Sequence, residues 1–362
     1  MYIRKLKLNN FRNYSLLELE LGQGICIFVG KNAQGKTNLL ESCCLVSMAR
    51  SHRTSRDRDM IMLSKEHASV AVECVERDGV HTVEICLTQS ERKRIRVNGL
   101  PCKRVGDMMG QIKTVVFSPE DLDLVKNGPA FRRRYADIYL SQVEPVYFYQ
   151  LTKYMQVLKE RNELLKQMAF KPDEASLEVF DEMLAQAAVP VIEQRSRFIQ
   201  RLDPVCREIH LALSGNTEEL KIEYAQCSQS DAEGIIKGLA STRSGDIKRG
   251  STHVGPHHDD IAIKLNGTDL RFYGSQGQQR TVALSLKLAQ LELMSREIGE
   301  SPILLLDDVL SELDPIRQRH LLNRLTGMQT IITTTHIIPE LASVKNKTVY
   351  TVNSGSIKKS NN

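Results

Sequence analysis

A glycine-rich segment near the N-terminus constrains this chain more than any other stretch. GKNAQGKT spans residues 30–37, follows the apolar run ICIFV and precedes NLLESCCLVSMA. This order predicts a strand over Ile25–Val29, a tight turn and a helix over Lys36–Met48. Such a turn leaves backbone N–H groups unpaired, and the helix adds its own free N–H groups and the positive end of its dipole. The segment therefore predicts a phosphate-binding loop.

The loop residues indicate how a nucleoside triphosphate would bind. Lys36 supplies a positive charge for the β- and γ-phosphates, and the Thr37 hydroxyl is a predicted Mg²⁺ ligand. Glycines at 30 and 35 let the backbone turn sharply and approach the phosphates. The expected nucleotide contacts in this segment are Gly30, Lys31, Asn32, Ala33, Gln34, Gly35, Lys36, Thr37 and Asn38. The alternative is a glycine turn before an ordinary helix.

An acidic segment, PILLLDDVLSELD, spans residues 302–314. Ile303–Asp307 is predicted to be a strand buried on both faces, as in the middle of a parallel sheet. Carboxylates are costly to bury unpaired, but ligands bind at the carboxyl ends of strands in open α/β sheets. Asp307 is therefore the expected Mg²⁺ partner, and Asp308 is placed to orient or deprotonate an attacking water. A cap for the following turn would give the same pattern at Asp308.

A third segment, residues 273–294, begins small and polar and continues as an amphipathic helix with Val282 and Leu286 among its apolar positions. Its start is expected to offer N–H groups and a hydroxyl to an anion, although an ordinary helix start has the same composition. The residues concerned are Ser275, Gln276, Gly277 and Gln278.

The order of these segments resembles that of ABC-type ATPases. In that family the serine–glycine element of one subunit completes the nucleotide site of another. The run IITTTH at 331–336 predicts a strand that ends in a histidine. His336 resembles the switch histidine that senses the γ-phosphate, although a histidine at a strand end is more often structural.

Composition limits the class of protein. The 362 residues are 41% hydrophobic, and no window approaches an uninterrupted 18-residue apolar stretch, so no membrane span is expected. The first residues read as a strand and not as a signal peptide. None of the eight cysteines forms a Cys-x-x-Cys pair, which favours a reducing cytoplasm over disulfide or metal use. The net charge of +5 is compatible with a nucleic-acid partner.

The rest of the chain shows a sheet-rich start and a helical middle. Strands are predicted at Tyr2–Leu8, Leu16–Leu21, Ala68–Val75, Val80–Leu87, Arg92–Val97 and Thr114–Phe117, with Asp78-Gly79 and Asn98-Gly99 as turns. The strands from 68 to 97 are expected to form an antiparallel meander. From Pro129 to about Leu213 the pattern is helical.

Two stripes with 3-4 spacing in the helical region predict an antiparallel helical pair, roughly 30–40 Å long at about 1.5 Å per residue. Arg161 interrupts the first stripe, a turn is expected at Lys171-Pro172, and Pro190 is expected to kink the second helix. The stripes are Leu151, Tyr154, Leu158, Leu165 and Met168, then Leu177, Phe180, Leu184, Ala187 and Val191.

Three further stretches are similar to those typical of the RecF family of bacterial recombination-mediator ATPases: FRNY at 11–14, FSPEDLDLVKNGPAFRRRYAD at 117–137 and THVGPHHDD at 252–260. The resemblance implies an α/β fold: an ABC-type P-loop ATPase head of mixed sheets and helices, residues 1–125 and 251–362. It also implies an inserted, mainly helical domain, residues 126–250, with a short antiparallel helical arm. The family commonly has arginine where His258 stands here, so any role of that arginine is in doubt.

The resemblance also implies ATP and Mg²⁺ as cofactors and an ATP-dependent homodimer on double-stranded and gapped DNA. It further implies loading of the strand-exchange recombinase together with RecO- and RecR-type partners. Asp308 and His336 are the expected catalytic residues. Because aspartate is one methylene shorter than the glutamate common at this place in other ABC ATPases, hydrolysis is expected to be slow. A non-hydrolysing ATP-gated DNA scaffold and an ATPase subunit of a transporter are the alternatives.

Several charged groups are candidates for contacts with DNA, a partner subunit, the nucleotide or a metal ion. Arg50–Arg58 and Arg92–Arg96 are the expected DNA contacts, through phosphates and not base stacking, because aromatics are few there and tryptophan is absent. Arg132–Arg134 form either a solvated face or a contact for DNA or a partner subunit, and Arg12 is a further predicted nucleotide contact. His253, His257, His258, Asp259 and Asp260 could suggest a metal site, but hydrogen-bonded structure is the preferred interpretation.

Overall fold

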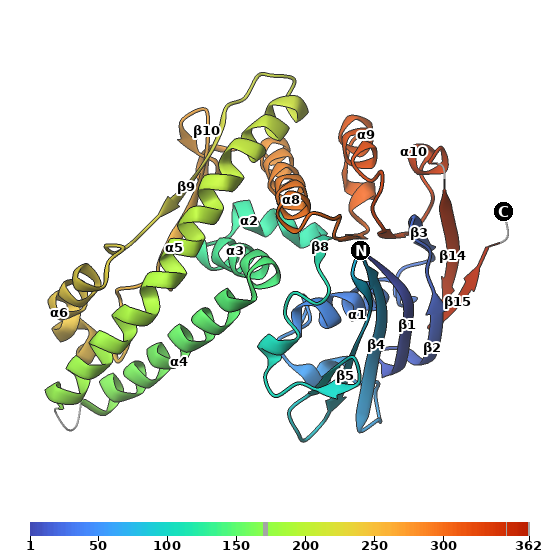
Figure 1. Ribbon diagram of the computed structural model, residues 1–362. Coiled ribbons are helices and arrows are strands. Elements are labelled where there is room, and N and C mark those ends of the chain that lie inside the picture. The colour runs from blue at the N-terminus through green and yellow to red at the C-terminus, as the bar shows by residue number, and fades with distance from the viewer. Residues whose placement is uncertain (169–172, 345, 361–362) are drawn as a thin grey trace. The chain divides into compact units, whose positions relative to one another are not determined.

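The computed structural model describes residues 1–168, 173–344 and 346–360 (Figure 1). The chain folds into two compact units, one made of Met1–Asp121 and Leu286–Asn362 and the other of Leu122–Ser285. The head and insert boundaries expected at 125/126 and 250/251 remain predictions. The turn expected at Lys171-Pro172 lies outside the described residues.

The first unit contains an antiparallel sheet of six strands in the order β2-β1-β4-β5-β6-β7. The strands are β1 (Tyr2–Phe11), β2 (Tyr14–Glu20), β4 (His67–Glu76), β5 (Gly79–Thr88), β6 (Arg94–Val97) and β7 (Leu100–Pro101). The predicted meander from 68 to 97 is confirmed. Strand β6 begins at Arg94 and not at Arg92, because the preceding residues form a turn in which the Glu91 N–H donates to the Thr88 hydroxyl (3.0 Å).

A second six-stranded sheet in this unit has the order β15-β14-β3-β13-β12-β8. Its strands are β3 (Ile25–Val29), β8 (Thr114–Phe117), β12 (Ile303–Asp307), β13 (Thr330–Thr334), β14 (Lys347–Asn353) and β15 (Ser356–Lys359). Strand β12 lies between β13 and β8, parallel to both, with all its residues buried, as predicted. Strand β13 ends at Thr334, short of the predicted His336, because the Thr334 hydroxyl donates to the His336 carbonyl (2.7 Å) and turns the chain.

Helix α1 (Lys36–Met48) has the predicted bounds and lies between the two sheets of the first unit. It packs against β8, β12 and β13 of one sheet and β4 and β5 of the other. A helix covered on both sides needs apolar residues all round, which explains the run LLESCCLVSM. The buried Glu41 within this run is the exception and is treated below.

The second unit is mainly helical. Its long helices are α3 (Pro129–Val143), α4 (Pro145–Met168), α5 (Glu174–Leu213) and α6 (Ala232–Arg249). Helices α4 and α5 run side by side in Figure 1, as the predicted arm requires. The helical assignment of α5 continues through Pro190 and through Pro204, so a kink at Pro190 remains a prediction. A three-stranded sheet, which was not predicted, joins β9 (Leu220–Ala225), β10 (Asp260–Leu265) and β11 (Thr268–Asp269).

Arg161 does not disrupt the arm, although it breaks the apolar stripe. Its side chain is fully buried. The guanidinium donates to Asp181 (2.7 Å), Asp246 (3.1 Å) and the Thr252 hydroxyl (2.7 Å). The position therefore joins α4, α5 and α6 by a buried ion-pair network, a role that spacing alone does not reveal.

Candidate nucleotide-binding site

Three parallel strands bring the predicted site residues of the first unit to one edge of the sheet. Strand β3 leads into the glycine-rich loop, β12 ends at Asp307, and β13 lies between them. The chain after β13 carries His336, so this residue follows the same edge. Ligands bind at such carboxyl edges in open α/β sheets.

The loop backbone needs glycine at both predicted positions because the chain approaches itself closely. Gly35 has φ 112°, and an added Cβ would lie 2.5 Å from Nδ2 of Asn13. A Cβ on Gly30 would lie 2.4 Å from the Val352 carbonyl oxygen. Any larger residue at either position would displace the loop.

The Lys36 ammonium lies across the loop. Its Nζ donates to the carbonyl oxygens of Gly30 (2.7 Å) and Lys31 (2.9 Å). Burial lowers the pKa of Lys36, while the carboxylates of Asp308 and Asp307 oppose that shift. The charge is thus held near the loop and balanced by the acidic pair.

Thr37 and Asp307 form the contact expected of a Mg²⁺-binding pair. The Thr37 hydroxyl donates to Oδ1 of Asp307 (2.9 Å), and the Thr333 hydroxyl donates to the same oxygen (2.7 Å). Carboxylate and hydroxyl oxygens are ligands that Mg²⁺ prefers. The donor set therefore fits the cation, and the direct contact shows that the two side chains converge.

Asp308 begins the turn after β12 in a left-handed conformation (φ 53°). Its N–H donates to the carbonyl and the hydroxyl of Thr333 (3.1 Å each). Its carboxylate accepts from the Ser311 hydroxyl at 3.4 Å, and within the described chain it does not cap the following 3₁₀ turn. Asp308 also lines the cavity described next, so its catalytic role and the alternative of a structural cap both remain predictions.

A cavity of about 190 Å³ lies between the loop and the acidic pair. Its lining consists of Asn32, Ala33, Gly35, Lys36, Thr37, Asn38, Arg53, Asp307 and Asp308. Gly30, Lys31 and Gln34 belong to the same loop without lining the cavity. His336 is exposed, and its Nδ1 lies 3.0 Å from the Thr335 hydroxyl.

Arg53 and Glu41 were not predicted as parts of this site. Buried Glu41 accepts two hydrogen bonds from Arg12 (2.7 and 2.8 Å) and one from Ser51. Arg53 lies 3.6 Å from the same carboxylate and donates to Asn38 (3.0 Å). Arg12, which was predicted to reach the nucleotide, thus forms an ion pair with Glu41. Arg53 lines the cavity. The sequence held one signal for this arrangement, namely a glutamate, Glu41, within an otherwise apolar helix.

The tip of the loop is held by segments from both ends of the chain. The Gln34 carbonyl accepts from Asn13 Nδ2 (3.0 Å) and from the Gly355 N–H (3.1 Å). Its side-chain oxygen accepts from the Ser354 N–H (2.7 Å). The Tyr14 hydroxyl donates to the Gly35 carbonyl (3.0 Å). FRNY therefore supports the loop, and the β14–β15 turn does so from the opposite end of the sequence.

The residues 275–278, here called the serine–glycine turn, belong to the second unit and open α8 (Gln276–Ile298), whose residues from Leu286 onward belong to the first unit. The Gln278 N–H donates to Ser275 Oγ (3.2 Å), and the Ser275 N–H donates to the Gln278 side-chain oxygen (2.9 Å). Ser275, Gln276 and Gly277 are exposed. The predicted helix N-terminus is present and its first residues are exposed, but the Ser275 hydroxyl and the Gln278 N–H are bonded to each other.

Comparison with known proteins bears on this arrangement. The family model described as RecF/RecN/SMC N terminal domain matches residues 2–358. A "DNA replication and repair protein RecF" of Listeria welshimeri is 41% identical over 371 residues, covering 99% of this chain and all of that protein. The chain belongs to the RecF family. Another RecF, from Oceanobacillus iheyensis, is 43% identical over 348 residues, covering 93% of this chain and 94% of that protein.

Solved structures agree with the RecF assignment. One described as the recombination mediator protein RecF-ATP in the RecFOR pathway is 36% identical with a TM-score of 0.94, covering 99% of this chain and 98% of that one. The Smc head domain from Pyrococcus furiosus, 17% identical with a TM-score of 0.59, shares the fold. The fold is therefore the predicted one: an ABC-type ATPase head with an inserted helical domain.

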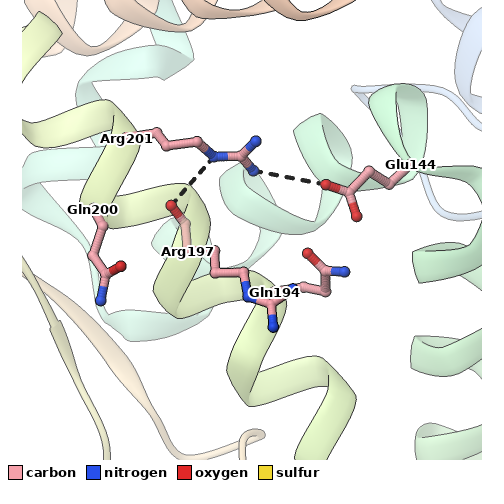
Figure 2. A pocket seen from close by; sticks show the side chains of 5 residues that line it. All are labelled: Glu144, Gln194, Arg197, Gln200 and Arg201. Carbon is pink, nitrogen blue, oxygen red and sulfur yellow. Dashed lines mark hydrogen bonds and ion pairs between the residues drawn. The ribbon is translucent and has the colours of Figure 1, made fainter.

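A second cavity in the RecF-family chain, about 330 Å³, lies on the second unit (Figure 2). Its lining consists of Glu144, Gln194, Arg197, Gln200 and Arg201. Arg201 pairs with Glu144 (3.7 Å), and Arg197 pairs with Glu193 (3.5 Å). Both arginines that line the cavity are thus paired with a carboxylate of the same unit.

The histidine-rich segment 252–260 is internally hydrogen-bonded. His257 and His258 each place Nε2 near the Thr252 carbonyl (3.0 and 3.1 Å), and His253 Nδ1 lies 2.8 Å from Asp246. Burial lowers the pKa of His257 to about 4. Across the described ranges no group of three or more suitable side chains is arranged to hold a metal ion.

Two arginines of the 132–134 run are held by contacts within the second unit. Arg132 is buried and makes a two-pronged ion pair with Asp260 (2.7 and 2.9 Å). Arg133 donates to the Asp259 carbonyl (2.7 Å). Arg134 is exposed. The RRR run is therefore mainly structural, which its helical position did not reveal.

The two basic segments of the first unit lie together. Lys93 Nζ lies 3.0 Å from Asp57, and it donates to the Ala49 carbonyl (2.5 Å). Arg56, Arg58 and Arg92 are exposed. Among the helices that the structure describes, none is long and apolar enough to cross a membrane.

Proposed function

We propose that this chain is an ATP-dependent DNA-binding recombination mediator of DNA replication and repair, which dimerises when it binds ATP. The observation that carries the proposal is the cavity lined by Lys36, Thr37, Asp307 and Asp308 in a RecF-family chain. Support comes from relatives named for DNA replication and repair and from a similar structure described as RecF-ATP. A cytoplasmic location remains a prediction.

The loop would hold the triphosphate through its N–H groups and through Lys36. Lys36 would exchange its present carbonyl contacts for phosphate oxygens. Thr37 and Asp307 would hold Mg²⁺, which neutralises phosphate charge. Arg53 would meet the nucleotide from the side of Asn38, with its direction set by Glu41.

The serine–glycine turn would come from a second copy of the chain. All residues that line the cavity belong to the first unit, whereas the turn belongs to the second unit and is exposed. A Cβ on Gly277 would meet its nearest neighbour, Ser275 Oγ, at 3.9 Å, an ordinary contact. The chain's own packing therefore does not require glycine there, whereas close approach of a phosphate would.

Asp308 would orient or deprotonate the attacking water, and His336 would sense the γ-phosphate. The short aspartate side chain favours slow turnover, so ATP would act as a timer for a clamp on DNA. The exposed basic surface of Arg56, Arg58 and Arg92 would contact duplex phosphates next to a gap. RecO- and RecR-type proteins would then assist recombinase loading.

Retention on DNA tests this function. We expect ATP to increase retention of the wild-type protein on a gapped duplex, and Asp308→Asn to retain DNA while losing hydrolysis by at least about tenfold. Lys36→Ala should lose both ATP-dependent retention and hydrolysis. DNA binding that is unaffected by ATP, Lys36→Ala or salt would contradict the proposal. Retention with no hydrolysis in the wild type would favour the scaffold alternative.

A further inference from the structure

A closed circuit of hydrogen bonds joins the serine–glycine turn to the end of α5. We propose that His210 and Glu218 are positioning residues, which hold Gln278 and thereby Ser275 in the orientation that meets the nucleotide of a second copy. This inference rests on the proposed function. It concerns side chains of the second unit alone, and none of the roles assigned above uses His210 or Glu218.

The first step of the circuit fixes the amide of Gln278. Its Oε1 accepts from the Ser275 N–H (2.9 Å), and its Nε2 donates to Oε1 of Glu218 (2.9 Å). A carboxylate accepts hydrogen bonds and does not donate them, so Glu218 selects the amide orientation that keeps Oε1 on Ser275. Without that partner, the amide could rotate and release the Ser275 backbone.

The second step fixes Glu218 itself. Its Oε2 lies 3.1 Å from Nε2 of His210, whose side chain is fully buried. His210 Nδ1 lies 3.1 Å from the Ser285 hydroxyl, which donates to the Thr281 carbonyl (2.8 Å). The imidazole bridges the glutamate and the body of α8 with a hydrogen on each ring nitrogen, because Nε2 faces an accepting carboxylate and the single Ser285 hydrogen goes to Thr281.

The last step returns to the turn. The Thr281 hydroxyl donates to the Gly277 carbonyl (2.8 Å), one residue before Gln278. His210 belongs to the last turn of α5, the 40-residue helix of the arm. The circuit thus ties the turn to the end of that helix.

Packing alone does not require this arrangement. Two apolar side chains would hold α5 and α8 together without the cost of desolvating a histidine and a carboxylate. The hydrogen-bonded network fixes the orientation of its side chains, because each hydrogen bond constrains the angle of the next group. Direction matters at a site that must meet a phosphate of another subunit within a fraction of an ångström.

The test separates ATP binding from dimer formation in the full-length chain. Glu218→Ala should leave the Kd for a fluorescent ATP analogue within about twofold of the wild type. It should raise the dissociation constant of the dimer formed with a non-hydrolysable ATP analogue by about tenfold, as expected when the Gln278 amide loses its charge-assisted hydrogen bond. Sedimentation measures the dimer.

Two variants control for charge and for structure. Glu218→Gln should restore the dimer to within about threefold, because its oxygen can accept from Gln278 while its NH₂ donates to Nε2 of a neutral His210. Glu219→Ala removes the same charge from the exposed neighbouring residue and should change nothing. If Glu218→Ala does not fold, Ser285→Ala provides a second variant. It removes the hydroxyl that links His210 to Thr281 and should raise the dissociation constant of the dimer about threefold.

The outcomes are distinguishable. If the wild type dimerises, and both Glu218→Ala and Ser285→Ala dimerise as strongly as the wild type, the positioning role is wrong and the proposed function stands. Equal weakening by Glu218→Ala and Glu219→Ala would show a general charge effect and would also overturn the inference. A wild type that stays monomeric with the analogue overturns the proposed function itself.

Discussion

Glu41 shows how one buried charge organises the approach to the nucleotide pocket. It is fully buried, yet it accepts hydrogen bonds from Arg12 and Ser51 and lies near Arg53. Burial alone would raise its pKa, but the hydrogen bonds from Arg12 and Ser51 outweigh that effect and hold the pKa below the usual 4.5. Glu41 therefore sets the direction of two arginines at once.

Replacing Glu41 by glutamine should cost about 1–3 kcal/mol of unfolding free energy at pH 7, because two arginines lose their charged partner. Because the pKa of Glu41 is lowered in the folded protein, its carboxylate contributes fully to the free energy of unfolding above about pH 4.5. This contribution is lost as the pH falls through the lowered pKa of the folded state. Urea unfolding at pH 7 and pH 3 measures both points. The gap between wild type and Glu41→Gln should narrow at pH 3, while the exposed Glu66→Gln should match the wild type; an unchanged gap would contradict this account.

At the scale of elements, Arg161 holds the arm together from inside. The side chain joins α4 to Asp181 of α5 and Asp246 of α6, all nearly or fully buried. Arg161→Met should lower the free energy of unfolding by about 3 kcal/mol, the lower end of the range for breaking a buried pair, because Asp181 keeps Arg243 (3.0 Å) and Asp246 keeps His253 (2.8 Å) as partners. Thermal or urea unfolding measures the loss.

Lys159→Met is the matched control, since Lys159 lies on the same helix with its side chain 77% exposed. It should change the free energy of unfolding by no more than about 0.5 kcal/mol. If Arg161→Met were as stable as Lys159→Met, the ion-pair network would contribute nothing to the arm.

The β14–β15 turn makes a second prediction at this scale. Gly355 has φ 77°, and an added Cβ would lie 2.3 Å from the Asn13 carbonyl oxygen. Gly355→Ala should displace the turn and the Gln34 tip with it, weakening ATP binding by about tenfold. A titration with a fluorescent ATP analogue measures the change.

Gly99 offers a matched control because it has the same φ of 77°, while an added Cβ would meet no heavy atom of the described chain within 4 Å. Gly99→Ala carries the backbone strain alone, about 1 kcal/mol, and should leave the ATP affinity unchanged. Equal ATP affinities for Gly355→Ala and Gly99→Ala would refute the role of the turn.

The sequence predicted some elements closely and could not predict others. The bounds of β3, β8 and β12 match because each is a short apolar run next to a glycine, a proline or an acidic pair, and those of α1 match because the helix begins directly after Gly35. The spacing of the stripe does not reveal the role of Arg161, because its partner Asp246 lies 85 residues away in the sequence. The support of Gln34 by Ser354 spans 320 residues, beyond the reach of any local pattern.

At the scale of the whole molecule, the proposed mechanism requires nucleotide sites that are shared by two chains. Lys36→Ala lacks a working loop, and Ser275→Arg lacks a working serine–glycine turn, so neither variant should hydrolyse ATP alone. A mixed dimer contains one complete site, made of the loop of Ser275→Arg and the turn of Lys36→Ala. Mixing the two variants should therefore restore part of the ATPase activity. If the mixture hydrolysed no more ATP than the separate variants, the proposal that two chains share each nucleotide site would be contradicted.

Sedimentation velocity with a non-hydrolysable ATP analogue tests the shared site most directly. The wild type should change from the 40.9 kDa monomer to a dimer when the analogue saturates it. Ser275→Arg should bind the analogue with unchanged affinity and remain a monomer, because its loop is intact while its turn is blocked. A wild type that stays monomeric at saturation, or a Ser275→Arg variant that dimerises as the wild type does, would contradict the account.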